Sequence, residues 1–110
     1  IMNYEKEKRQ YPRLPHDSVM NMYRMDHQDD RFYAQMQDYS QGGLSMKTTE
    51  KLVIGQLVYL EMMNHDNNVK GPEKHKGYGG SVKWVTPDPD SGDNQFYKYG
   101  VEYFEPVTYH

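Results

Sequence analysis

Two arginines four positions apart, Arg9 and Arg13, are the side chains in this sequence best suited to holding a phosphate-bearing ligand. A guanidinium offers a planar fork of donors that matches phosphate oxygens or the N7/O6 edge of guanine, and its flat face can stack on a base. Pro12 stiffens the chain between the two arginines, so an extended segment can lay both across one ligand. The alternative, and the better explanation of this pair taken alone, is a solvated basic patch beside Glu5 and Glu7.

A second group of side chains, Asp38 and Ser40 followed by Gly43, lies at the end of a predicted strand. A carboxylate there can accept hydrogen bonds from N1–H and N2–H₂ of guanine, and the serine hydroxyl can add another. The glycines in this segment would let a ligand approach the backbone closely. The alternative, again the better one for the segment taken alone, is an ordinary turn that joins two strands.

Alternation of side-chain type with a period of two predicts the strands that must position these groups. It is clearest where Phe32, Ala34 and Met36 alternate with more polar neighbours. We expect six strands, near residues 18–25, 31–37, 44–48, 57–63, 82–84 and 97–103, separated by polar segments at 26–30, 38–43, 64–80 and 87–94. With little helix, this pattern favours an all-β barrel or sandwich over residues 17–110, preceded by an extended, charged arm over residues 1–16.

Composition and charge limit the classes of function that the chain can have. It has 110 residues, enough for one domain, and a formal net charge of −3. This charge speaks against a globally basic nucleic-acid binder, and we expect no DNA partner. The absence of cysteine excludes disulfides, zinc–thiolate sites and thiol catalysis, and it fits a reducing compartment. No apolar run approaches the roughly 18 residues of a membrane span, so we expect no membrane insertion.

Taken together and in order, the two groups resemble the signature of the PilZ domain family, which is RxxxR in a charged arm, then a strand, then DxSxxG. Residues Gly80–Trp84 are similar to that family's Gly-x-Val-x-Trp strand. Residues Tyr99–Tyr103 are similar to its closing Gly-Val-x-Phe strand, with Tyr103 in place of Phe. Either motif alone is weak, but both in order on a matching β pattern are fairly specific, and the resemblance covers residues 8–104.

This resemblance implies a six-stranded antiparallel PilZ-type β-barrel that binds the bacterial second messenger cyclic di-GMP. By this carry-over, Arg9 and Arg13 hold the phosphates and the guanine edge. Asp38 and Ser40 hold a guanine, and Gly43 shapes the turn. The domain is then a cytoplasmic receptor and not an enzyme. It needs no cofactor beyond its ligand, and it acts on a protein partner or a fused effector domain when the ligand binds.

Two other functions stay open beside the cyclic di-GMP receptor. One is a PilZ-like protein-interaction domain that binds no nucleotide, but the intact RxxxR and DxSxxG residues favour nucleotide binding. The other is an OB-type barrel for single-stranded nucleic acid. The acidic charge and the lack of a basic, aromatic-studded face speak against it.

Other polar and aromatic candidates are better explained as ordinary surface or core. His65 and Asp66, with His75 in the same predicted loop, lack a recognised ligand spacing, so we expect them to be solvated side chains on the surface and to form no metal site. Trp84 could stack on a ligand, but its alternating strand position predicts a place in the core.

The arm itself is predicted to act as a switch. Residues 1–13 are polar and have little to bury, so we expect them to be mobile in the free protein. Charge-assisted bonds from Arg9 and Arg13 to the ligand would then supply the ordering energy. The arm would clamp over the ligand and change the surface that partners meet.

Overall fold

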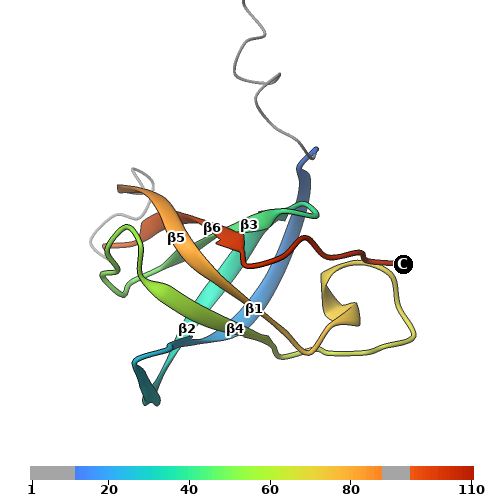
Figure 1. The fold of residues 1–110 in the computed structure, drawn as a ribbon, viewed down its shortest axis with the longest axis horizontal. Helices are drawn as coiled ribbons and strands as arrows, with labels where there is room; N and C mark the ends of the chain where they lie inside the picture. Colours follow the sequence, from blue (N-terminus) through green and yellow to red (C-terminus); the bar gives the residue numbers. More distant parts are fainter. Residues whose placement is uncertain (1–11, 88–94) are drawn as a thin grey trace, which may run out of the picture.

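The computed structural model describes residues 12–87 and 95–110, apart from the side chains of His27 and Gln28. Within these residues, six antiparallel strands close into a barrel in the order β1-β2-β3-β6-β5-β4 (Figure 1). The strands are β1 (Leu14–Arg24), β2 (His27–Tyr39), β3 (Gly43–Thr48), β4 (Leu57–Met62), β5 (Gly77–Pro87) and β6 (Tyr97–Tyr103), and a 3-10 turn, η1 (Pro72–Lys74), precedes β5. The predicted six-stranded antiparallel barrel is confirmed, whereas Arg9 and most of the predicted arm lie outside the described residues.

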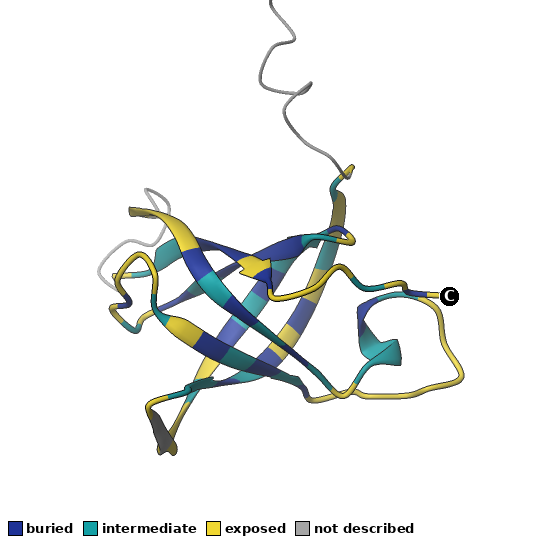
Figure 2. Cartoon of the chain, viewed as in Figure 1, coloured by how far each residue is buried: buried dark blue, intermediate teal, exposed yellow. Residues whose placement is uncertain are grey.

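The interior of the barrel is filled by the apolar half of each alternating strand, because successive side chains of a strand point to opposite faces. Figure 2 shows these buried positions as dark bands along the strands. Five of the buried side chains in the described chain are methionines that are at most 3% exposed, namely Met20, Met22, Met36, Met46 and Met62. Methionine is unbranched and fills irregular gaps. Five of the sixteen buried hydrophobic residues in the described chain are therefore flexible, unbranched side chains.

Strand β1 begins at Leu14, so the barrel includes the last three residues of the predicted arm, 1–16. Pro15 is tolerated near the start of the strand because it removes only one ladder donor. In the β1–β2 pair it lies opposite Asp38. The chain that carries Arg13 is therefore fixed against β2 at the point where the DxSxxG segment begins.

Two further strand boundaries differ from the prediction in polar or glycine-rich sequence. The predicted loop at 26–30 is a two-residue turn, because β2 begins at His27, and Asp29 and Asp30 are exposed strand positions. Strand β5 begins at Gly77, inside the predicted loop 64–80. A Cβ atom at Gly77 would collide with the Tyr59 ring. The missing Cβ atom leaves room for the Tyr59 ring over the strand, so this glycine does not mark a loop.

The two ends of the barrel are closed by different tyrosines. At one end, next to η1, the rings of Tyr78 and Tyr103 stack with centroids 5.0 Å apart. Toward the other end, the Tyr99 hydroxyl donates to the Glu50 carbonyl at 2.8 Å and accepts from the Leu52 amide at 2.9 Å. The helical part of the described chain is confined to η1, and none of it is long and apolar enough to cross a membrane.

Strands β5 and β6 approach each other at Gly80, where a Cβ atom would collide with the main-chain oxygen of Glu102. Gly80→Ala should therefore lower the free energy of unfolding by about 1–3 kcal/mol, the usual cost of overpacking. Gly79→Ala is the matched control, because its Cβ would meet flexible side chains, the nearest being the Phe104 ring at 3.1 Å. Urea unfolding should give a lower midpoint for Gly80→Ala than for Gly79→Ala, and equal midpoints would contradict this account.

Candidate functional site

An ion pair joins the two sequence motifs on the outside of the barrel. Arg13 Nη1 lies 2.9 Å from Asp38 Oδ1, and the two side chains are 25% and 35% exposed. The pairing of β1 with β2 sets this contact, because Leu14 lies opposite Tyr39 and Pro15 lies opposite Asp38. The structure thus brings Arg13 and Asp38 together, while Arg9 lies outside the described residues.

A β-bulge in β2 determines which way Asp38 points. In the β2–β3 pair, Met36 lies opposite Met46 but Asp38 lies opposite Ser45, so Gln37 is an extra residue on β2. A bulge of this kind places two successive side chains on one side of the sheet. Met36 is buried and Asp38 is partly exposed. The bulge therefore turns the motif carboxylate outward, beside Gln37.

The other DxSxxG residues build the turn between β2 and β3. Ser40 is only 6% exposed, and its amide donates to the Gly43 carbonyl at 2.8 Å. Its hydroxyl accepts from the Gly42 amide at 3.2 Å. A Cβ atom at Gly43 would collide with the Val101 main-chain oxygen. In this structure Ser40 serves the turn, so a contact between its hydroxyl and a ligand stays a prediction.

Trp84 lies on the outer surface, and its predicted place in the core is wrong. It is 39% exposed, whereas Val82 of the same strand is fully buried. The cause is a second bulge, because Val82 lies opposite Val101 and Trp84 lies opposite Gly100, which leaves Lys83 as an extra residue on β5. A Cβ atom at Gly100 would collide with the indole, so the glycine lets the indole pack closely against β6.

The indole and the motif carboxylate belong to one row across four strands. Asp38 of β2 lies opposite Ser45 of β3, Ser45 lies opposite Gly100 of β6, and Gly100 lies opposite Trp84 of β5. Neighbours in such a row are the closest cross-strand pairs of a sheet. The row therefore places an aromatic face and a carboxylate on the same outer side of the barrel.

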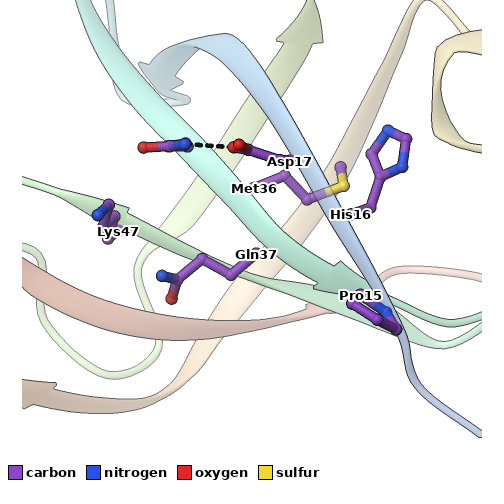
Figure 3. A pocket seen from close by; sticks show the side chains of 7 residues that line it. Pro15, His16, Asp17, Met36, Gln37 and Lys47 are labelled. Carbon is purple, nitrogen blue, oxygen red and sulfur yellow. Dashed lines mark hydrogen bonds between the residues drawn. The ribbon is translucent and has the colours of Figure 1, made fainter.

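Two lysines add positive charge to the adjacent row. Lys47 of β3 lies opposite Lys98 of β6, and Gln35 of β2 lies opposite Lys47. A hollow of about 480 Å³ opens here (Figure 3) and is lined by Pro15, His16, Asp17, Gln35, Met36, Gln37 and Lys47. The amide of Gln35 donates to the Asp17 carboxylate across it. The sequence analysis missed these polar lining residues, whose only signal was their position on the polar side of alternating strands.

His16 borders the hollow and ties β1 to the loop that contains η1. Its Nε2 lies 2.8 Å from Glu73 Oε2, and the Ser18 hydroxyl donates to the same carboxylate. Burial acts to raise the pKa of Glu73, but the hydrogen bonds from His16 and Ser18 outweigh it and lower this pKa below its ordinary value. Across residues 12–87 and 95–110, no three His, Asp or Glu side chains lie together in a way that could hold a metal ion.

Two solved structures have a fold similar to that of this chain. The chain is similar to the Bacillus subtilis inhibitor of motility MotI/DgrA, with a TM-score of 0.61 and 20% identity, over 91% of this chain and 44% of that one. It thus spans less than half the length of that protein. It is also similar to the PilZ domain with c-di-GMP of YcgR from Escherichia coli, with a TM-score of 0.61 and 13% identity, over 88% of this chain and 78% of that one. At these identities the likeness is one of fold.

Sequence comparison assigns the family. No curated protein matches the chain. The family model for the PilZ domain, however, matches residues 7–108, which include both motifs, all six strands described above and most of the segment after β6. A match of this extent, on a barrel of the matching fold, leads to one conclusion: the chain belongs to the PilZ domain family.

Proposed function

We propose that this domain is a cyclic di-GMP receptor that binds its ligand on the outer face of the barrel, around Asp38. The observation that carries the proposal is the Arg13–Asp38 ion pair, which joins the two motifs at 2.9 Å beside a polar hollow. A guanidinium and a carboxylate side by side offer donors for phosphate and an acceptor for guanine within one small area.

Each neighbouring group has a part in this proposal. Arg13, together with Arg9, holds the phosphates, and Asp38 accepts from the N1–H and N2–H₂ of a guanine. Lys47 and Lys98 add positive charge toward a dianionic ligand. The exposed indole of Trp84, in the same row as the carboxylate, offers a flat face on which a base can stack.

The relatives support a regulatory role for the domain. One structural neighbour is a PilZ domain of YcgR with c-di-GMP, and another is an inhibitor of motility. By analogy with these relatives, this domain acts as a sensor, and ligand binding changes its contacts with a protein partner or a fused effector domain. The domain binds and releases the ligand without changing it chemically.

Titration of the purified chain with cyclic di-GMP should give a dissociation constant of about 1 μM or lower, which is about −8 kcal/mol. Trp84 is the single tryptophan, so its fluorescence should change along the same binding curve that calorimetry reports. GTP is the control, because it carries one guanine and lacks the cyclic diester. If saturating cyclic di-GMP gives no heat and no fluorescence change, the chain is better described as a protein-interaction domain that does not bind nucleotide.

Asp38→Ala should weaken cyclic di-GMP binding by about 1–3 kcal/mol, because donors on the guanine lose water without gaining a charged acceptor. The fold should survive, since the ion pair with Arg13 is partly exposed and such pairs contribute about 0–1 kcal/mol to stability. Asp30→Ala is the matched control, an exposed carboxylate on the same strand but near its other end. Calorimetry should separate the two variants, and wild-type affinity in Asp38→Ala would show that the guanine lies elsewhere.

Cyclic di-GMP incubated with the pure domain should be recovered unchanged. Hydrolysis of a phosphodiester needs a positioned base or a metal-activated water, and the proposed site is made of groups that bind and stack. Chromatography of the nucleotide before and after incubation tests this directly. If linear dinucleotide accumulates in proportion to the amount of protein, the domain is an enzyme and the receptor proposal is wrong.

A further inference from the structure

The segment after β6 supports the turn that carries the DxSxxG motif. Three successive carbonyls of that turn accept hydrogen bonds from residues 103–109. The Ser40 carbonyl accepts from the Tyr109 hydroxyl at 2.6 Å, the Gln41 carbonyl from the Val107 amide at 2.9 Å and the Gly42 carbonyl from the Tyr103 amide at 2.9 Å. These contacts join parts of the chain more than sixty residues apart, so the turn is held from behind by the C-terminal segment.

Tyr109 has the largest part in this support, because both its ring and its hydroxyl are used. The residue is 9% exposed, and its ring meets the Tyr39 ring edge-on at 4.8 Å. Its hydroxyl also lies 2.8 Å from the Tyr103 hydroxyl. Burial raises the pKa of Tyr109 to about 12, so the phenol is neutral at physiological pH and keeps the proton that it donates to Ser40.

The C-terminal segment is itself held on its other side by the loop before β5. The Tyr109 carbonyl accepts from the Gly71 amide at 2.9 Å, and the His75 ring contacts the Thr108 carbonyl. Figure 1 shows this segment, in red, passing beside the yellow loop that contains η1. The segment therefore lies between the loop and the DxSxxG turn and contacts both.

We propose that Tyr109 is a positioning residue of the ligand site, which acts through Ser40 and Tyr39 to set the place of Asp38. Asp38 directly precedes Tyr39, whose ring lies on Tyr109, and it stands two residues before the carbonyl that Tyr109 binds. The inference rests on the proposed function for the identity of the ligand. Coupling between two sites is reciprocal, so a ligand that fixes Asp38 must also stabilise the contacts of the C-terminal segment with the DxSxxG turn.

The test compares Tyr109→Phe with Tyr99→Phe in the whole chain. Each change removes one hydroxyl that donates to a main-chain carbonyl and leaves the ring in place, but Tyr99 acts toward the opposite end of the barrel. Both variants should unfold at a lower temperature than wild type. Measured where both are folded, the dissociation constant for cyclic di-GMP should rise about threefold to tenfold in Tyr109→Phe alone, the loss expected for one hydrogen bond. Equal affinities in the two variants would overturn the proposal.

Amide hydrogen exchange gives a second readout that a merely stabilising residue would not move. Cyclic di-GMP should slow exchange at the Val107 amide, which donates to Gln41, and should do so less in Tyr109→Phe. If the wild-type chain binds cyclic di-GMP but exchange at the Val107 amide stays equally fast, the coupling is refuted. If wild type binds no cyclic di-GMP, the proposed function fails separately. The inference is then decided by the Ser40 amide, which should exchange faster in Tyr109→Phe than in Tyr99→Phe without ligand.

Discussion

Strand β6 joins β3 to β5 at positions where glycines face its backbone. A Cβ atom at Gly43 of β3 or at Gly80 of β5 would collide with a main-chain oxygen of β6, and a Cβ atom at Gly100 of β6 would displace Trp84. Closure of the barrel therefore depends on close backbone approach on both sides of one strand. Gly43 belongs to the DxSxxG motif as well, so the turn of the proposed site and the closure of the barrel share one residue.

The period-two pattern predicted most of the fold because burial in a barrel follows it directly. Met20 and Met22, and likewise Tyr99 and Val101, lie inside as their spacing indicates. The pattern failed at Trp84, where an extra residue in the strand reverses the alternation, and no local feature of the sequence announces a bulge. The contact of Arg13 with Asp38 depends on strand register, which the alternation does not determine. The hydrogen bond from Tyr109 to Ser40 comes from a segment without alternating side chains, so the pattern could not predict it either.

The ion pair between Arg13 and Asp38 changes the energetics expected of the arm. The Asp38 carboxylate already holds the Arg13 side chain in place, so ligand binding need not offset the entropy cost of ordering that side chain. The ligand must instead compete with Asp38 for the guanidinium. That competition is mild, because partly exposed pairs contribute about 0–1 kcal/mol. Asp38 thus binds the Arg13 guanidinium in the way that a phosphate of the ligand would.

The methionine-rich core has a chemical consequence. Oxidation turns a methionine thioether into a polar sulfoxide, which cannot be accommodated in an apolar interior. Met20, Met22, Met36 and Met46 are fully buried, so an oxidant reaches them only when the barrel opens. Oxidation during an opening would leave a sulfoxide, which persists until a sulfoxide reductase removes it, and a chain less able to close again. The amount of sulfoxide at these four positions would therefore increase with the frequency of barrel opening. A bound ligand that stabilises the closed barrel would slow its formation.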